Sequence, residues 1–195
     1  MNNLNNDVFN ENIAKAAKVL KDGGTMLYPT DTIWGLGCDA TNEKAVEKIY
    51  KIKKRPPEKS PIILLDDELK LFEYVANIPP IAIDLINSVN NPVSIIYPHA
   101  KNLPKNVIAK DGSIAIRIVR HKFCKQLIGL INKPIVSTSA NISGEPAPTF
   151  FNDISKEIIN AVDFLVSREM EESIEVRPST VVKFNDDGEF EIIRS

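Results

Sequence analysis

Short apolar segments alternate with amphipathic ones along most of this chain, and this alternation restricts its fold more than any other feature. The apolar runs at residues 25–28, 61–65 and 134–137 have the length of buried strands. At residues 13–20 and 42–50 the apolar positions instead recur every three or four residues, which is typical of helices. Because strands and helices alternate, the chain is predicted to form an α/β domain. Further strands are predicted at 93–97, 114–119, 164–166, 180–184 and 190–193, and further helices at 67–75, 81–89, 121–131 and 153–160.

The length of the chain favours a single domain. A chain of 195 residues suits one compact unit better than two, and no linker rich in Pro, Gly or Ser divides it. Residues 1–12 include six Asn and show no apolar period. We therefore predict a flexible lead-in at 1–12 and one domain over 13–195.

Charge and cysteine content exclude several classes of protein. The formal net charge of −2 excludes the broad positive field of a dedicated nucleic-acid binder. The two cysteines, Cys38 and Cys124, are too few and too far apart for a disulfide framework. No apolar run approaches the roughly 18 residues needed to cross a bilayer. We therefore expect a cytoplasmic protein without a membrane contact.

The connection at residues 29–41 is the first candidate site, because a long connection without a periodic pattern is more often functional than structural. Within it, residues 35–40 match G-x-G-x-x-A, a form of the dinucleotide-binding fingerprint. That fingerprint requires a strand leading directly into its first glycine, whereas residues 29–34 intervene here. The match is therefore weak. Trp34 is predicted either to line a pocket or to fill the core.

A basic segment at residues 51–59 is the second candidate site. Helical spacing places Lys53 on the buried stripe of its helix, and Pro56 ends the helix directly after Arg55. A lysine and an arginine held beside a buried face suit the recognition of phosphate or carboxylate. The alternative is a solvated basic end that interacts favourably with the helix dipole.

The third candidate site is a run of hydroxyl and amide side chains at residues 137–146. It follows a short buried strand, and ligands in open α/β sheets collect at the carboxyl ends of strands. Hydroxyl, amide and backbone N–H donors at such a place can hold anionic oxygens, although the same residues are also common in ordinary loops. A nucleophilic serine is disfavoured because G-x-S-x-G is absent.

Four segments occur in an order that resembles one family. They are Tyr28-Pro29-Thr30-Asp31-Thr32, Lys53-Lys54-Arg55-Pro56, Ser137-Thr138-Ser139-Ala140-Asn141 and Pro178-Ser179-Thr180-Val181-Val182. In this order they resemble the short, single-domain form of the YrdC-like threonylcarbamoyl-AMP synthases. The resemblance extends from about residue 13 to the end of the chain and implies a strongly twisted mixed sheet with flanking helices around a large basic cavity.

The resemblance also implies an activity and its partners. An enzyme of this family condenses L-threonine, bicarbonate and ATP into threonylcarbamoyl-AMP and pyrophosphate, with Mg²⁺ carried by the ATP. Downstream proteins then transfer the threonylcarbamoyl group to tRNA, and a weak contact with tRNA itself is also expected. An RNA-binding module on the same fold is the alternative, but residues 51–59 contain no aromatic side chain to stack on bases.

The resemblance assigns roles residue by residue. It implies that Lys53 and Arg55 are catalytic, and that the ATP-binding residues are Lys53, Arg55, Ser139, Asn141 and Arg194. It implies that the threonine-binding residues are Thr30, Thr32, Arg117 and Ser179. The chain departs from the family pattern at residues 89–94, where W-P-G-P-x-T is common, and at Leu65, where a His is often found.

Overall fold

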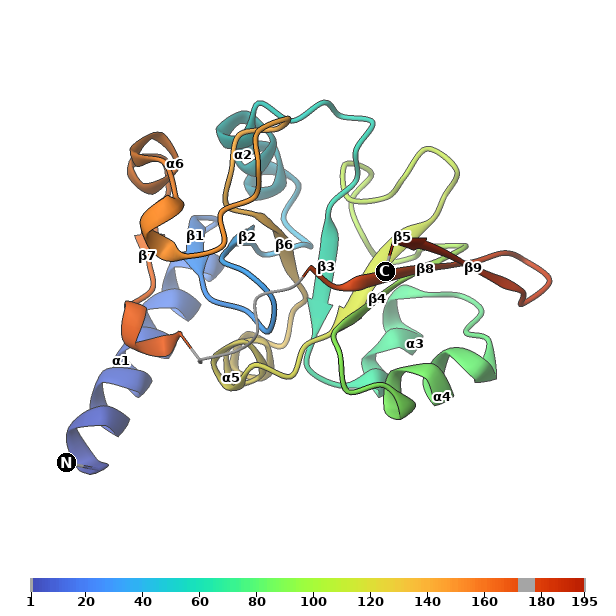
Figure 1. The fold of residues 1–195 in the computed structure, drawn as a ribbon, viewed down its shortest axis with the longest axis horizontal. Helices are drawn as coiled ribbons and strands as arrows, with labels where there is room; N and C mark the ends of the chain where they lie inside the picture. The colour runs from blue at the N-terminus through green and yellow to red at the C-terminus, as the bar shows by residue number, and fades with distance from the viewer. Residues whose placement is uncertain (1, 172–177, 195) are drawn as a thin grey trace.

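The protein forms one mixed sheet with helices on both sides (Figure 1). The computed structural model describes residues 2–171 and 178–194. These residues form a nine-stranded sheet in the order β7-β1-β2-β6-β3-β5-β4-β8-β9. The pairs β1–β7, β3–β5 and β4–β8 are parallel, and the other neighbouring pairs are antiparallel. The predicted α/β class and mixed sheet are therefore confirmed.

The bounds of the strands are β1 Thr25–Tyr28, β2 Gly35–Cys38, β3 Ile62–Leu65, β4 Val93–Tyr97, β5 Ile114–Ile118, β6 Ile135–Ser139, β7 Phe164–Leu165, β8 Thr180–Phe184 and β9 Phe190–Arg194. The α-helices are α1 Asn2–Lys21, α2 Glu43–Lys53, α3 Leu71–Tyr74, α4 Pro80–Ser88, α5 Lys122–Ile131 and α6 Lys156–Ala161. Short 3-10 helices occupy Glu68–Lys70, Phe151–Asp153 and Arg168–Met170. Among the described residues, no helix is long and apolar enough to span a bilayer.

Successive residues of β3 pack into opposite layers of the core. Ile63 and Leu65 belong to the cluster that also contains apolar residues of α2, α3 and α4. Leu64, between them, belongs to the cluster formed with α1 and α5. Because side chains alternate across a strand, this central strand needs apolar residues at every position to be covered on both faces. The continuous apolar run at residues 61–65 is the sequence signal for this burial on both faces.

Helix α1 corrects the prediction for the N-terminal segment. Residues 2–12 belong to this helix, which the sequence pattern did not predict, and the flexibility of the segment stays a prediction. The Asn12 side chain accepts a hydrogen bond from the backbone N–H of Ser167, and the Phe9 ring lies edge-on to Phe123 of α5. Asn has a low helix propensity, so the sequence pattern hid a helix that is held by tertiary packing. The start of the family domain at residue 13 stays a prediction.

Strand β2 corrects the prediction for residues 29–41. The strand pairs antiparallel with β1 and with β6, and therefore lies inside the sheet. Two glycines in four residues are unusual in a strand, which is why the pattern predicted only a connection. A Cβ at Gly37 would collide with the carbonyl oxygen of Val136 and with the Tyr28 ring. The glycines therefore permit close strand packing, and the weak dinucleotide fingerprint is wrong.

We expect Gly37→Ala to lower the free energy of unfolding by about 1–3 kcal/mol, because overpacking a well-packed core costs that much. Chemical denaturation followed by circular dichroism measures the change. Gly129→Ala in α5 is the matched control, because its new Cβ would meet only an ordinary van der Waals contact. A Gly37→Ala protein as stable as wild type would contradict the close-packing interpretation.

Candidate active site

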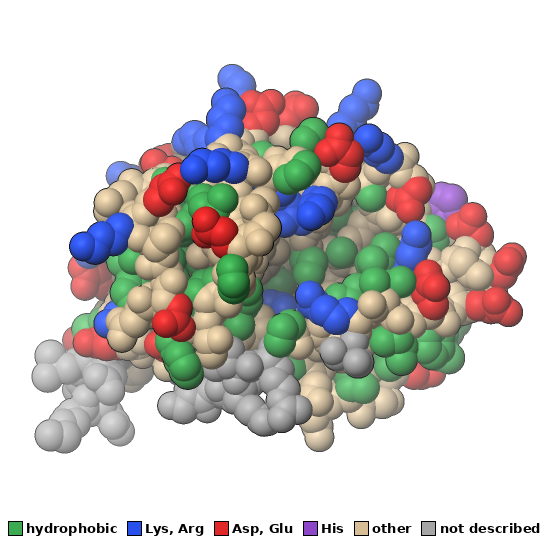
Figure 2. All heavy atoms as spheres, turned by 45° about the horizontal axis from the view of Figure 1, so that its top comes forward, with side chains coloured by type: hydrophobic (Ala, Val, Ile, Leu, Met, Phe, Trp, Pro, Cys, Tyr) green, Lys and Arg blue, Asp and Glu red, His purple; other side chains and the backbone are tan. Residues whose placement is uncertain are grey.

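A cavity of about 250 Å³ lies where β2, β5 and β6 meet the end of α2 and the start of β8. Figure 2 shows a hollowed face of the molecule with Lys and Arg side chains around the hollow. Among the described residues, the charged side chains that line this cavity are those of three arginines, Arg55, Arg117 and Arg194. The large basic cavity that the resemblance implies stays a prediction. The lining comprises Thr32, Ile33, Trp34, Gly35, Arg55, Ile62, Arg117, Ser137, Thr138, Ser139, Ala147, Pro178, Ser179 and Arg194.

Most of the predicted site residues meet at this cavity. Those that line it are Thr32, Arg55, Arg117, Ser139, Ser179 and Arg194. The other three, Thr30, Lys53 and Asn141, are not among the lining residues, but each hydrogen-bonds to a residue that is, Thr30 to Thr32 and both Lys53 and Asn141 to Ser139 O. The structure therefore brings these residues together and separates those that line the cavity from those beneath it, while their roles stay predictions.

Arg55 presents its guanidinium to the cavity from just beyond α2. The helix ends at Lys53, and the capping residue Lys54 adopts a left-handed conformation (φ 49°) that lets the chain turn. Arg55 Nε donates to Lys59 O (2.6 Å), Nη2 to Ser60 O (2.9 Å) and Nη1 to Thr138 Oγ1 (3.2 Å). A guanidinium has five N–H donors, so two stay available for a ligand. Burial lowers the pKa of Arg55 from its ordinary value, but the group stays cationic at neutral pH.

Lys53 is buried beneath the loop that follows β6. Its side chain is 1% exposed, which confirms the predicted position on the buried stripe of the helix. Nζ donates to Ser139 O (2.5 Å) and Asn141 O (2.6 Å), and lies 3.4 Å from Asn141 Oδ1. An ammonium has three N–H donors, and three acceptors surround this one. The observed contacts of Lys53 therefore hold the loop, and its phosphate contact stays a prediction.

Burial also changes the acidity of Lys53. Removal from water, together with the smaller effect of the nearby Arg55 charge, lowers the pKa of its ammonium to about 8. The backbone carbonyl of the same residue accepts a hydrogen bond from Ser143 N (2.8 Å). The loop is thus fastened to the end of α2 by both the side chain and the backbone of one residue.

Asn141 shapes this loop from within. Its Nδ2 donates to Ile142 O (3.0 Å) and to Glu145 O (2.7 Å). The amide therefore stabilises the turn at residues 142–145, while Ser139 lines the cavity itself. This explains why a run of turn-forming residues has a defined shape here.

Arg117 enters the cavity from β5, and a buried carboxylate accompanies it. Arg117 Nη2 lies 3.1 Å from Asp31 Oδ1, and the two side chains are 5% and 6% exposed. The backbone N–H of Arg120 donates to Asp31 Oδ2 (3.1 Å). Asp31 is the residue that the sequence interpretation missed. The available signal was its position between Thr30 and Thr32, two residues that the resemblance already assigned to the site.

The two threonines of this segment form a directed chain of hydrogen bonds. Arg117 Nη1 donates to Thr32 Oγ1 (3.3 Å), which lies 3.0 Å from Thr30 Oγ1. Thr30 Oγ1 in turn donates to Ile33 O (2.8 Å). Because each hydroxyl has one proton, Thr32 must donate to Thr30. Thr30 therefore fixes the loop at residues 30–33. Among the described residues, Arg117 Nε is a buried donor without a hydrogen-bond partner.

Ser179 and Arg194 form another part of the cavity wall. Arg194 of β9 donates through Nη2 (2.8 Å) and Nε (3.2 Å) to Ser179 O. The Ser179 hydroxyl is 2.9 Å from that of Ser94 in β4. The guanidinium is therefore held in place by the backbone of the neighbouring strand rather than by an acid.

The segment that departs from the family pattern is held by Arg120. Its guanidinium donates to Asn90 O (2.9 Å), Ile86 O (2.9 Å) and Val89 O (2.7 Å). Arg120 therefore holds the carboxyl end of α4 and the residues that follow it. Leu65, the other departure, is fully buried in the core cluster of β3. Within residues 2–171 and 178–194, no group of three or more His, Cys, Asp or Glu side chains is arranged to hold a metal ion.

Comparisons with known proteins place this chain among relatives of one family. Residues 18–195 match the Sua5/YciO/YrdC family model, which is described as telomere recombination. A protein of Pseudoalteromonas translucida named threonylcarbamoyl-AMP synthase is 36% identical over 172 residues, which cover 87% of this chain and 91% of that protein. A Pseudomonas aeruginosa protein of the same name is 37% identical over 133 residues, which cover 68% of this chain and 71% of that protein.

Solved structures show the same fold. The structure of P. abyssi Sua5 complexed with L-threonine superposes with a TM-score of 0.79 at 28% identity, covering 88% of this chain and 50% of that one. This chain therefore spans about half the length of the P. abyssi protein. E. coli YciO, at 23% identity, superposes with a TM-score of 0.80 over 93% of this chain and 87% of its own. That likeness concerns the fold.

Proposed function

Because this chain belongs to the Sua5/YciO/YrdC family, we propose that it is an L-threonylcarbamoyladenylate synthase, a nucleotidyltransferase. It would condense L-threonine, bicarbonate and ATP into threonylcarbamoyl-AMP and pyrophosphate. The observation that carries the proposal is the convergence of Arg55, Arg117 and Arg194 in one cavity whose described lining holds no carboxylate. Three fixed cations suit a reaction that brings several anions together.

The proposed chemistry has two steps. In the first, the threonine amine attacks the carbon of bicarbonate, and loss of water gives a carbamate. In the second, a carbamate oxygen attacks the α-phosphorus of ATP, and the bond from that phosphorus to the bridging oxygen breaks. Pyrophosphate leaves with the electron pair. No protein nucleophile is needed, so the protein contributes mainly orientation and charge stabilisation.

Arg55 and Ser139 are proposed to contact the phosphates. The two available N–H donors of Arg55 and the Ser139 hydroxyl belong to the same cavity. Charge-assisted hydrogen bonds from a guanidinium are the strong type for phosphate oxygens. Lys53 then acts one layer below, because it holds the carbonyl groups of the loop that carries Ser139. Arg194 is proposed to approach the nucleotide from β9.

The threonine side of the cavity is proposed to lie at Arg117, Thr32 and Ser179. Arg117 lines the cavity, and its guanidinium supplies the positive charge that suits a substrate carboxylate. The complex of P. abyssi Sua5 with L-threonine supports threonine as the substrate. Thr30 contributes by fixing Thr32 through the hydroxyl chain.

Magnesium is proposed to arrive with ATP. Mg²⁺ commonly uses phosphate oxygens and water with few protein ligands, which fits a cavity whose described charged lining is cationic. When bound, the ion would neutralise charge on the leaving pyrophosphate.

The product is proposed to pass to proteins that transfer the threonylcarbamoyl group to tRNA. The RNA-binding alternative is not favoured, because the curated relatives are named as synthases.

Pyrophosphate release tests this proposal directly. Purified protein is supplied with ATP and Mg²⁺, with and without L-threonine and with and without bicarbonate. We expect release only when both are present. Release that needs neither, or no release from a folded sample, would overturn the proposed activity. L-serine in place of L-threonine tests whether the cavity selects the methyl group.

The lowered pKa of Lys53 predicts opposite pH trends for substrate binding and for stability. As pH rises through about 8, Lys53 Nζ loses a proton, and with it the positive charge and one hydrogen bond to the loop after β6. We therefore expect the affinity for ATP to fall. The unfolded chain, with a pKa near 10.5, keeps its proton longer. The contribution of Lys53 to the free energy of unfolding therefore rises between about pH 8 and 10.5.

Isothermal titration with ATP and Mg²⁺ across this pH range measures the affinity. Lys53→Met is the control, because its affinity is expected to be low and without a step near pH 8. Urea denaturation of both proteins over the same range isolates the stability trend of Lys53. An ATP affinity that stays constant through pH 9 in the wild type would contradict the proposed role of the ammonium.

A further inference from the structure

The hydroxyl of Ser94 is buried in the sheet directly against a residue of the candidate active site. Ser94 belongs to β4 and is 0% exposed, whereas Ser179 is 2% exposed and lines the cavity. The two Oγ atoms are 2.9 Å apart. Within the described residues, this is the one hydrogen-bond partner of the Ser94 hydroxyl. A polar group in the core therefore has a proposed substrate-binding residue as its partner.

The sheet places Ser94 between two of the arginines of the cavity. Strand β4 pairs antiparallel with β5, and this register, continued by one residue, brings Ser94 opposite Arg117. On its other side Ser94 pairs with Val181, which pairs in turn with Arg194 of β9. Residues at opposite positions on neighbouring strands share a face of the sheet. One row across the sheet therefore carries Arg117, Ser94 and Arg194 on the side of the cavity.

Hydrogen-bond counting fixes the direction of the contact between the two hydroxyls. A serine hydroxyl has one proton to donate and two lone pairs that accept. Among the described residues, Ser179 Oγ is the acceptor within reach of the Ser94 proton. A fully buried donor that stays unpaired costs free energy, so Ser94 donates and Ser179 accepts.

The second lone pair of Ser179 Oγ faces Arg194. Arg194 Nη2 lies 3.4 Å from Ser179 Oγ and 2.8 Å from Ser179 O. With Ser94 and Arg194 as its two donors, the Ser179 hydroxyl keeps only its own proton for a ligand in the cavity. A group bound there must therefore accept a hydrogen bond, as a carboxylate or carbamate oxygen does. An ammonium group, which only donates, finds no lone pair available.

We propose that Ser94 is a positioning residue that holds the Ser179 hydroxyl as a hydrogen-bond donor toward an anionic oxygen of the amino-acid substrate. Ser94 does not line the cavity, so it acts through Ser179 alone. The identity of the substrate rests on the proposed synthase activity, whereas the direction of the hydrogen bond does not.

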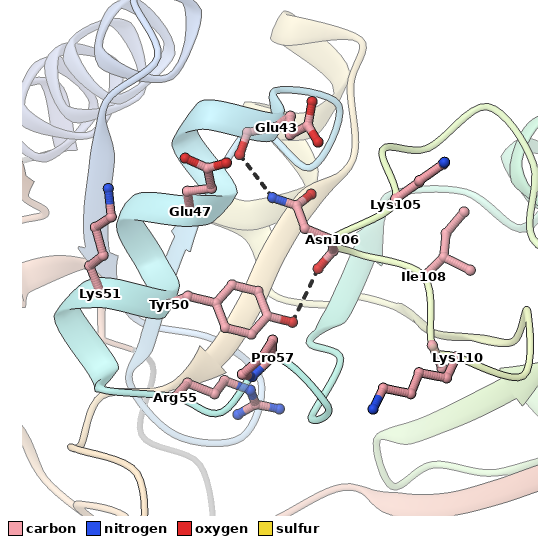
Figure 3. A pocket seen from close by; sticks show the side chains of 11 residues that line it. Glu43, Glu47, Tyr50, Lys51, Arg55, Pro57, Lys105, Asn106, Ile108 and Lys110 are labelled. Atoms are coloured by element: carbon pink, nitrogen blue, oxygen red, sulfur yellow. Dashed lines mark hydrogen bonds between the residues drawn. The ribbon is translucent and has the colours of Figure 1, made fainter.

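Arg55 lies outside the row that contains Ser94. Figure 3 shows Arg55 at the end of α2, beside Tyr50 and Pro57. Its three hydrogen bonds go to the segment that follows α2 and to β6. The two bonds from Arg194 to Ser179 O also do not involve the Ser94 hydroxyl. Loss of that hydroxyl should therefore change the dependence of the rate on the amino acid and leave the dependence on ATP unchanged.

Pyrophosphate release over a range of L-threonine concentrations, with ATP and bicarbonate saturating, tests this role. Ser94→Ala is expected to raise the KM for L-threonine about tenfold, with kcat and the KM for ATP within about twofold of wild type. Ser94→Thr keeps the hydroxyl and should recover most of the affinity. Ser94→Cys fills the space with a weak donor, so it should resemble Ser94→Ala although the packing is preserved.

Thr25→Val is the matched control for the loss of a buried hydroxyl. Thr25 is 1% exposed, and its hydroxyl donates to Asp163 away from the cavity. This variant should lose stability like Ser94→Ala, as measured in urea, while its KM for L-threonine stays at the wild-type value.

A double-mutant cycle separates positioning from a general structural effect. Ser179→Ala should raise the KM for L-threonine at least as much as Ser94→Ala, and the combined variant should add little, because Ser94 acts through Ser179. Additive effects would overturn the proposal. So would a wild-type KM for L-threonine in Ser94→Ala, or an equal rise of the KM values for L-threonine and ATP.

Isothermal titration of L-threonine into the same four proteins distinguishes this inference from the synthase activity. If none releases pyrophosphate but both single variants weaken L-threonine binding without additivity, the synthase proposal fails and the role of Ser94 stands. If only Ser94→Ala binds like wild type, the role of Ser94 alone fails. If wild type does not bind L-threonine, or Ser179→Ala binds it as tightly, the proposed threonine site and the role of Ser94 fail together.

Discussion

Arg55→Ala is expected to lower kcat/KM for ATP-dependent pyrophosphate release by about 10²–10³-fold, while the protein stays folded. The guanidinium is held by Lys59, Ser60 and Thr138, so its remaining donors are already oriented when the substrate arrives. Removal of one preoriented donor at a site of charge development costs about this much in other enzymes. Initial rates over a range of ATP concentrations, with threonine and bicarbonate saturating, measure the effect.

Two further variants sharpen this experiment. Arg55→Lys keeps the charge but cannot reproduce the planar arrangement of donors, so we expect little recovery of activity. Lys54→Ala, one residue away, removes an exposed ammonium that pairs with Glu157 outside the cavity, and activity should be unchanged. Activity in Arg55→Ala within twofold of wild type would remove this residue from the proposed phosphate site.

The largest effect on stability is expected from Asp31→Ala. This change leaves the Arg117 guanidinium buried without its carboxylate, and breaking one side of a buried ion pair costs about 3–5 kcal/mol. It also removes the acceptor for the backbone N–H of Arg120. Denaturation in urea, with the slope of the transition compared between proteins, measures the loss.

The matched control is Glu11→Ala, which breaks an exposed i,i+4 pair with Lys15 in α1 and should cost at most about 0.5 kcal/mol. Combining Asp31→Ala with Arg117→Met should recover part of the stability, because the stranded charge is gone. A double variant that is less stable than Asp31→Ala alone would show that Arg117 stabilises the fold without its carboxylate.

Local patterns in the sequence were sufficient for most of the fold. The apolar run at 61–65, the alternation at 114–118 and the Asn42 cap, which accepts a hydrogen bond from Ala45 N, each report on a few neighbouring residues. Strand β2 could not be found in this way. Its glycines are required by contacts with Tyr28 and Val136, which are distant in sequence or on another strand.

The candidate site shows the same limit. Motif spacing located the segments around Thr32, Arg55 and Ser139, and the structure places them at one cavity. Motif spacing could not show that Lys53 donates to backbone carbonyl groups or that Arg194 donates to Ser179 O. Both facts depend on how segments far apart in the chain meet, and residue types alone do not determine the partner of a long cationic side chain.

The double attachment of Lys53 to the loop limits how insertions and deletions can be accommodated. One residue added or removed within α2 would rotate the end of the helix by roughly 100° relative to its start. Nζ would then leave the carbonyl groups of Ser139 and Asn141, and Arg55 would leave the cavity. Changes of length are thus far better tolerated in an exposed turn such as residues 185–188 than in this helix, whose length is set by the chemistry at its end.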